Sequence, residues 1–177
     1  MSERHHSEIE MDDLTMQKAV DYYYLIYTSA FKRVSNRYRE EVLSIAPPGI
    51  SWWGGEPFTN FELIKKSKAY IESLPWHEYG IEKDKFVYSV VSNFTIVNDE
   101  ILDFLISNKI YLFVSLDGGE KEHDKNRVFT NNQGSFSRVS HNIDILIRKA
   151  PEYCKKYMVI QAVLANNIVT ILFSALT

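Results

Sequence analysis

Apolar residues along this chain alternate between helical spacing and strand spacing. A stripe of apolar and tyrosine side chains at helical spacing predicts a helix over residues 13–31, which Asp12 or Asp13 can cap. We expect the tyrosines of that stripe to pack in the core. Three further helices are predicted, namely over residues 60–73, after an Asn98 cap and after a Ser135 cap.

Short runs rich in β-branched and aromatic residues lie between these helices and predict strands. Such runs occur at residues 50–53, 86–91, 110–116 and 157–163. Because they are apolar on both faces and separated by helices, the chain is expected to form an α/β fold with a parallel sheet covered by helices. The sheet is either open and doubly wound or a barrel, or part of one. In each case a ligand binds beyond the carboxyl ends of the strands.

Polar or glycine-rich turns directly follow three of the predicted strands. They are Gly54-Gly55-Glu56-Pro57, then Ser92-Asn93, and then Asp117-Gly118-Gly119 after Ser115-Leu116. Glycine, asparagine, aspartate and proline are turn formers in any protein, so each segment can be a plain turn. Their convergence on one edge of a parallel sheet favours a binding site there.

The residue types at this edge suit one class of ligand. Two glycines let the backbone approach a ligand closely, and the Glu56 carboxylate suits an ammonium group. Asn93 and Ser115 can hydrogen-bond sugar hydroxyls, and Arg127 offers a planar fork for a carboxylate. Together these groups are compatible with a nucleoside that carries an amino acid.

Composition and charge narrow the function classes. The 177 residues are 45% hydrophobic and 14% aromatic, which is typical of a globular domain. The formal net charge of −3 gives no electrostatic footprint for nucleic acid or for an anionic membrane. The N-terminus lacks an apolar signal-peptide core, and the apolar run 168–176 is roughly half of a membrane helix. We therefore expect a cytoplasmic protein with neither a nucleic-acid nor a membrane partner.

Three sequence segments together resemble the radical S-adenosylmethionine (radical SAM) superfamily. Trp52-Trp-Gly-Gly-Glu-Pro-Phe58 is similar to its GGEP segment, and Val91-Ser-Asn-Phe-Thr95 resembles a strand end that usually reads T-N-G-T. Val114-Ser-Leu-Asp-Gly118, His123-Asp-Lys-Asn-Arg127 and Gly134-Ser-Phe136 resemble the S-L-D-G, H-D-x-x-R and G-S-F run of the peptide- and protein-modifying subgroup. That subgroup includes sulfatase maturases and ribosomal-peptide maturases.

The resemblance implies an incomplete (β/α) barrel with parallel strands and outer helices, open on one side. It implies that residues 54–57 hold the methionyl amino group, and that Ser115 and Arg127 bind the ribose and carboxylate region of SAM. It also places Ser92 and Asn93 along the ribose. The expected SAM-binding set is thus Gly54, Gly55, Glu56, Pro57, Ser92, Asn93, Ser115 and Arg127.

The sequence also departs from the subgroup. Phe94 stands where glycine is usual and is expected to crowd that turn. For Asp117, His123 and Asp124 we expect structural roles as turn caps and loop pins, with a direct chemical role as the alternative.

Radical SAM enzymes reductively cleave SAM to a 5′-deoxyadenosyl radical, using a 4Fe-4S cluster that three cysteines hold. This chain has one cysteine, Cys154, which is expected to be a structural thiol. His5 and His6 are adjacent but are expected to belong to a plain tail. We therefore predict no catalytic residue and no metal ligand in this chain.

We interpret the sequence as a tail (1–12), a partial radical SAM core (13–167) and an apolar tail of uncertain origin (168–177). The hypothesis is a truncated radical SAM enzyme whose cysteine triad lies upstream of Met1. Translating the DNA upstream of Met1 in frame tests it. The implied partners are an electron donor and a peptide or protein substrate, with a small cysteine-rich peptide as one candidate.

Two alternatives remain open. The chain is either a non-catalytic, degenerate barrel that binds SAM or a peptide, or an unrelated barrel that binds a sugar or a phosphate. The absence of a G-x-x-x-x-G-K sequence counts against the last. For a partial barrel, unpaired strand edges further predict self-association.

Overall fold

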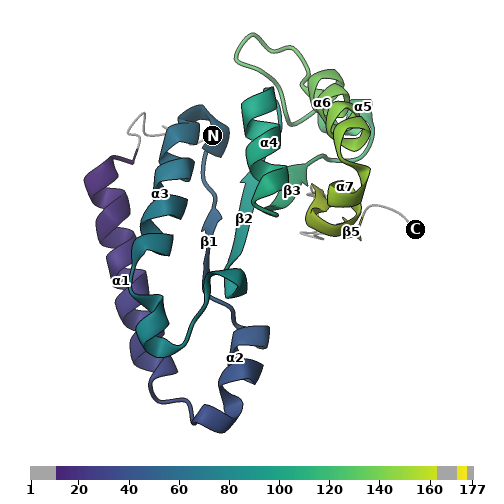
Figure 1. Ribbon diagram of the computed structural model, residues 1–177. Coiled ribbons are helices and arrows are strands. Elements are labelled where there is room, and N and C mark those ends of the chain that lie inside the picture. The colour runs from purple at the N-terminus through teal and green to yellow at the C-terminus, as the bar shows by residue number, and fades with distance from the viewer. Residues whose placement is uncertain (1–10, 163–170, 175–177) are drawn as a thin grey trace. The chain divides into compact units, whose positions relative to one another are not determined.

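The computed structural model describes residues 11–162 and 171–174, and these divide into two compact units. One unit comprises the described residues up to Pro48 together with Asn60–Phe86. The other comprises Gly49–Thr59 and the described residues from Val87 onward. Figure 1 labels the α-helices and most of the strands of both units, and we describe each unit by itself.

The first unit is helical. Its elements are α1 (Asp13–Phe31), η1 (Asn36–Tyr38), α2 (Arg39–Ile45), α3 (Phe61–Ser73), η3 (Trp76–Tyr79) and η4 (Lys83–Lys85). As predicted, α1 begins after an Asp12 cap, whose Oδ1 accepts a hydrogen bond from the Thr15 amide at 2.7 Å. The sequence did not predict α2.

Aromatic packing holds the first unit together. The indole ring of Trp76 is buried, and its N–H donates to the Ile71 carbonyl at 2.7 Å. The Tyr24 ring meets it edge-on, with ring centroids 4.7 Å apart, and Tyr27 and Phe86 meet it edge-on as well. Tyr24 and Tyr27 of α1 thus pack against the core residue Trp76, but they are only partly buried.

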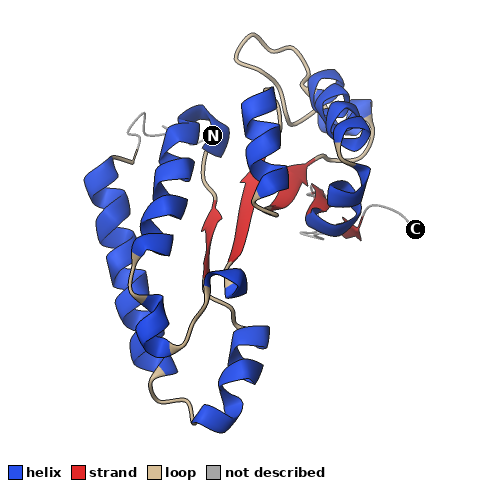
Figure 2. Cartoon of the chain, in the orientation of Figure 1, coloured by secondary structure: helices blue, strands red, loops and turns tan. Residues whose placement is uncertain are grey.

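The second unit contains the sheet. Its strands are β1 (Gly49–Trp52), β2 (Val87–Ser92), β3 (Tyr111–Ser115), β4 (Met158–Ala162) and β5 (Ile171–Ser174). Its helices are η2 (Pro57–Asn60, whose last residue belongs to the first unit), α4 (Asp99–Ser107), α5 (Glu120–His123), α6 (Phe136–Lys149) and α7 (Pro151–Tyr157). Figure 2 shows the strands in red and the helices in blue.

The strand order is β1-β2-β3-β4-β5, and the first four strands are parallel. Each right-handed crossover therefore adds the next strand on the same side, whereas a doubly wound sheet reverses that direction. This order decides between the two architectures that the sequence left open, and it confirms the α/β fold with the strand succession of a barrel.

One strand was not predicted from the sequence, and one local prediction was wrong. Residues 171–174 lie in the run 168–177, for which no strand was predicted, but they form β5, which pairs antiparallel with β4. Ser135 precedes α6 without capping it through its side chain. Instead Asp124 Oδ1 accepts the hydrogen bond of the Phe136 amide at 2.8 Å, because the Ser135 hydroxyl is bonded elsewhere.

The core of the second unit lies on one face of the sheet. Tyr88, Val90 and Ser92 of β2 and Leu112 and Val114 of β3 are buried, while the alternate residues of both strands are only partly covered or exposed. Although β2 and β3 carry apolar residues on both faces, only one face of each strand is fully buried. Other large buried side chains of this unit include Phe58, Phe94, Ile101, Leu102, Leu105, Ile110, Val139, Ile143, Leu146, Tyr153 and Met158.

Candidate functional site

The register of the sheet brings three of the predicted turns to one edge. Trp52 pairs with Val90, and Ser92 pairs with Val114, so β1, β2 and β3 end within a few residues of one another. Ser115 in turn pairs with Gln161 of β4. The turns that follow β1, β2 and β3 therefore all lie at the carboxyl edge of the sheet, as predicted.

The glycine turn after β1 leaves open space for a ligand. Gly54 has a φ of 143°, a conformation that favours glycine. A Cβ atom added at Gly54 or at Gly55 would meet no other atom within 4 Å, and both residues are exposed. The backbone of this turn is therefore accessible, which fits the predicted approach to a ligand.

The Glu56 carboxylate fastens the end of β1 to the end of β2. Its Oε1 accepts hydrogen bonds from the Ser92 hydroxyl at 2.8 Å and from the Phe58 amide at 3.2 Å, and its Oε2 accepts one from the Asn93 amide at 2.8 Å. Burial raises the pKa of Glu56, and these three hydrogen bonds oppose that shift. Glu56 thus has a structural role, and its predicted contact with an ammonium group stays a prediction.

Ser92 and Ser115 lie on opposite faces of the sheet. Ser92 pairs with Val114, and adjacent residues of a strand point to opposite faces, so Ser115 lies on the other side. The Ser92 side chain is buried, and its hydroxyl oxygen also accepts the Phe94 amide at 2.8 Å. Ser92 therefore reaches the glycine turn through Glu56. Its predicted place along a ribose stays a prediction.

The turn after β2 has an unusual backbone at Phe94. Asn93 Oδ1 accepts hydrogen bonds from the Thr95 amide at 3.0 Å and the Thr95 hydroxyl at 2.7 Å, which closes the turn. Phe94 has a φ of 56°, in the left-handed region, and no exposed surface. Its carbonyl accepts a hydrogen bond from the side-chain amide (Nδ2) of buried Asn142 at 2.8 Å. The Phe94 side chain is thus part of the core.

Arg127 is held by Asp117, ten residues earlier in the chain. Its Nε donates to Asp117 Oδ2 at 2.5 Å and its Nη2 donates to Oδ1 at 3.3 Å, so the pair is bidentate. The Asp117 side chain is 9% exposed, whereas the Arg127 side chain is 28% exposed. These bonds use two of the five N–H donors that an arginine side chain carries.

Comparisons with known proteins agree on one group of enzymes. No family model matches the sequence. Over 105 residues, 59% of this chain, it is 36% identical to a cysteine-type anaerobic sulfatase-maturating enzyme of Clostridium novyi (strain NT). Part of the chain is homologous to a radical SAM sulfatase-maturating enzyme. The matched region is 27% of that enzyme.

Solved structures of a maturase share the fold. Native anSMEcpe with bound AdoMet superposes with a TM-score of 0.62, covering 91% of this chain and 37% of that protein at 20% identity. Native anSMEcpe with bound AdoMet and Cp18Cys peptide gives a TM-score of 0.60, with 88% and 36% covered at 20% identity. The chain thus spans about a third of the length of that maturase, and the fold is part of a radical SAM barrel.

Gln161 is a further polar residue at this edge of the sheet, and the sequence analysis did not identify it. Gln161 lies beside Ser115 in the register of the two parallel strands, and both side chains are partly exposed on the same face. Asn93, one residue beyond the Ser92–Val114 pair, continues the same row. Gln161 is a single amide in the otherwise apolar run 157–163, so only the register identifies its neighbours.

Cys154 does not have the character of a radical SAM cluster ligand. Its side chain is buried, and burial raises the pKa of its thiol to about 11. Among the described residues, no group of three or more histidine, cysteine, aspartate or glutamate side chains is arranged to hold a metal ion. Cys154 is thus a structural thiol, as predicted, while His5 and His6 lie outside the described residues.

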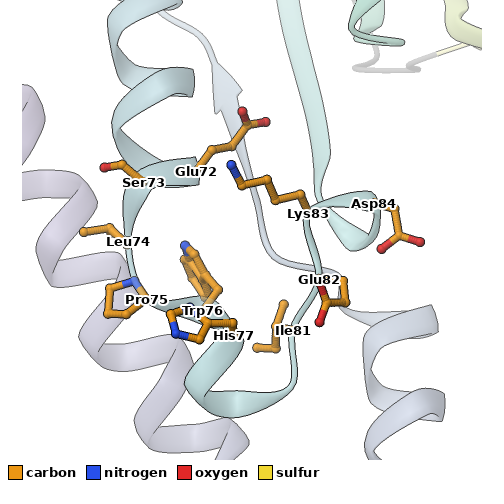
Figure 3. A pocket seen from close by; sticks show the side chains of 10 residues that line it. All are labelled: Glu72, Ser73, Leu74, Pro75, Trp76, His77, Ile81, Glu82, Lys83 and Asp84. Carbon is orange, nitrogen blue, oxygen red and sulfur yellow. The ribbon is translucent and has the colours of Figure 1, made fainter.

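A separate cavity of about 680 Å³ lies within the first unit. Figure 3 shows the side chains that surround it, which are Glu72, Ser73, Leu74, Pro75, Trp76, His77, Ile81, Glu82, Lys83 and Asp84. None of these residues belongs to the three turns that resemble the radical SAM motifs. In the described parts of the chain, no helix is long and apolar enough to span a membrane.

Proposed function

We propose that this chain is part of a radical SAM enzyme that modifies a peptide or protein, and that the carboxyl edge of β1–β3 binds SAM. The observation that carries the proposal is the convergence of three turns on that edge. The homology to a sulfatase-maturating enzyme supports the same assignment. SAM supplies a sulfonium centre that bears a 5′-deoxyadenosyl group.

The residues of the edge divide the ligand between them. The accessible backbone of Gly54–Pro57 binds the amino group, and three N–H donors of Arg127 remain for the carboxylate. The Ser115 hydroxyl binds the ribose, with Ser92 and Asn93 supporting that side of the pocket. Open space at both glycines and the remaining arginine donors fit a ligand with these groups.

The iron–sulfur cluster does not fit the residues of this chain. Such a cluster needs three thiolates, and the single thiol here is buried and has a raised pKa. We therefore assign no step of radical chemistry to these 177 residues. In the complete enzyme that we propose, the cluster and the electron donor act from outside this sequence.

The substrate that we propose is a peptide or protein that contains a cysteine. Support comes from the related anSMEcpe, of which one structure has a bound Cp18Cys peptide, and from the cysteine-type maturase of Clostridium novyi. A second candidate function is a non-catalytic module that binds SAM or a peptide. The presence of only one cysteine in the whole sequence favours that alternative.

Equilibrium dialysis of the full chain against radiolabelled SAM tests the proposed site. We expect saturable binding, weakened about fivefold by Ser115→Ala, since a neutral hydrogen bond contributes roughly 1 kcal/mol. The matched control is Ser137→Ala, at an exposed position of α6 in the same unit. Tighter binding of ribose 5-phosphate than of SAM would instead support a sugar-phosphate barrel, and equal binding by both variants would reject the role of Ser115.

Anaerobic reconstitution with iron and sulfide tests whether this chain can hold a cluster by itself. We expect no cluster absorbance and no 5′-deoxyadenosine from this chain, because it lacks the thiolates. A bound cluster together with 5′-deoxyadenosine would contradict that expectation and establish catalysis by the chain itself.

A further inference from the structure

The segment between β3 and α6 contains a buried chain of hydrogen bonds that ends at Arg127. His123 is 0% exposed and Ser135 is 6% exposed. The Asp117 amide donates to His123 Nδ1 at 3.2 Å, His123 Nε2 lies 2.9 Å from the Ser135 hydroxyl oxygen, and that hydroxyl donates to the Arg127 carbonyl at 2.9 Å. The series links residues that are up to 18 positions apart in the sequence.

The direction of every bond in this series is fixed by its first donor. A backbone amide can only donate, so His123 Nδ1 must accept and carries no proton. The ring proton is then on Nε2, which donates to the Ser135 oxygen. That leaves the Ser135 proton for the Arg127 carbonyl. The series is therefore complete only with a neutral imidazole in its Nε2–H tautomer.

Arg127 is attached to this network at two points. Its carbonyl accepts the Ser135 hydroxyl, and the Ser135 amide also donates to that carbonyl at 3.2 Å. Its guanidinium is held by the carboxylate of Asp117, whose own amide donates to His123. The imidazole ring thus connects Ser135, which binds the Arg127 carbonyl, to Asp117, which binds the Arg127 guanidinium.

We propose that His123 is a positioning residue, whose neutral imidazole holds Asp117 and Ser135 in place and thereby orients the Arg127 guanidinium toward the ligand edge. The ligand in this statement rests on the proposed function, but the orientation of Arg127 does not. His123 has no exposed surface with which to contact a ligand, so its effect on binding acts through Arg127.

The neighbouring charges make the network sensitive to acid. Burial lowers the pKa of His123, the Arg127 cation lowers it further, and the carboxylates of Asp117 and Asp124 act in the opposite direction. Protonation would place a second N–H on Nδ1, facing the Asp117 amide N–H. Because the pKa of His123 lies below its usual value of 6.5, the neutral imidazole is lost only as the pH falls through that lowered pKa. Arg127 loses its fixed orientation over the same pH range.

Nuclear magnetic resonance of the full chain without ligand tests the positioning directly. Ring ¹⁵N shifts report the tautomer of His123, and solvent exchange of the Arg127 Nε–H reports its bond to Asp117. We expect the Nε2–H tautomer at neutral pH, and exchange about tenfold faster in His123→Ala, as for the loss of one charge-assisted bond. His123→Asn, which keeps an acceptor near the Asp117 amide, should retain part of the protection.

Two matched references accompany these variants. His141→Ala, at an exposed position of α6, should leave the Arg127 exchange unchanged, and the Nε–H of exposed Arg138 corrects for the intrinsic pH dependence of exchange. If His123→Ala fails to fold, the wild-type acid titration replaces it, because the Arg127 signal must then change together with the His123 ring signals.

Several outcomes overturn the proposal. One is a His123 ring that is doubly protonated, or protonated on Nδ1, at neutral pH. Another is a rate of Arg127 Nε–H exchange that is the same in folded His123→Ala as in the wild type. The third is an Arg127 exchange rate that does not change as His123 titrates. Dialysis against SAM then separates the two proposals. Weaker SAM binding by His123→Ala supports both, whereas a wild-type chain with an ordered Arg127 and no SAM binding rejects the proposed function alone.

Discussion

At the scale of single residues, Phe94 combines an unfavourable backbone with a favourable side chain. Its φ of 56° costs about 1–2 kcal/mol for a residue with a Cβ atom, while its ring is completely buried. Glycine at this position would relieve the backbone but empty the core. In the T-N-G-T motif that residues 91–95 resemble, glycine usually occupies this position, which fits a turn that requires a positive φ.

We therefore predict that Phe94→Gly destabilises the protein less than Phe94→Ala does. Both variants lose the ring, at about 3–5 kcal/mol, but only glycine regains the backbone term, so it should be more stable by about 1 kcal/mol. Urea denaturation measures both. At Leu105, buried in helix α4, the same pair should rank in the opposite order. An alanine variant of Phe94 at least as stable as the glycine variant would contradict the strain.

Glu56 should make stability depend on pH. Its pKa is raised by burial, so the folded state holds the proton more tightly than the unfolded state does. The free energy of unfolding of the wild type, relative to Glu56→Gln, should then fall as the pH rises from the usual value of 4.5 through the raised pKa. Urea denaturation of both proteins between pH 4 and 8 measures it, and a difference that rises with pH would reverse the assigned shift.

At the scale of secondary-structure elements, local signals predicted what local contacts decide. Asn98 caps α4 as predicted, with its Oδ1 accepting the Ile101 amide at 2.8 Å. The equivalent prediction for Ser135 failed because that hydroxyl is engaged by His123 and Arg127, which are 12 and 8 residues away. A polar residue before an apolar stripe looks the same in sequence whether its side chain caps the helix or bonds to a distant residue. Only the tertiary structure distinguishes the two cases.

The start of α6 depends on close packing between Gly134 and Asp124. A Cβ atom on Gly134 would lie 2.0 Å from Asp124 Oδ2, and the same carboxylate caps α6. We predict that Gly134→Ala costs about 1–3 kcal/mol because it displaces the cap. Asp124→Ala alone should cost about 1 kcal/mol, as for other caps.

A double-mutant cycle in urea denaturation isolates this contact. In the Asp124→Ala background, Gly134→Ala should cost at least about 1 kcal/mol less than in the wild type, since the obstructing carboxylate is gone. Gly55→Ala is the matched control, because its Cβ would meet nothing within 4 Å, and it should change stability by at most about 0.5 kcal/mol. Additive costs would show that Asp124 is not the obstacle.

At the scale of the whole molecule, parallel topology made the candidate site predictable. Once strands and helices alternate, the carboxyl ends of neighbouring strands must lie at one edge. Gly54 and Asn93 follow the ends of β1 and β2, and Ser115 is the last residue of β3. The faces of the sheet were not predictable, because burial on one side depends on which helices cover it. The Asp117–Arg127 pair was likewise not predictable, since nothing in the local sequence shows that these two charged side chains meet.

An exposed strand edge leads to the last prediction. Within the described residues β1 has a single strand neighbour, β2, and Ser51 on β1 is exposed while Trp53 just beyond it is 81% exposed. An open edge beside a large apolar side chain promotes pairing between chains. We expect concentration-dependent association of the isolated chain in light scattering, and a monodisperse monomer at high concentration would contradict this.

Two lysine variants with the same net charge distinguish association through the β1 edge from an effect of net charge on repulsion between chains. Ser51→Lys puts a lysine on the edge, where it should reduce association. The formal net charge of −3 becomes −2 in this variant, so a purely global effect would weaken repulsion and increase association. Ser137→Lys makes the same change of charge on exposed α6 and should not reduce association. A decrease in Ser51→Lys alone therefore locates the contact at β1, whereas equal behaviour of the two variants places it elsewhere.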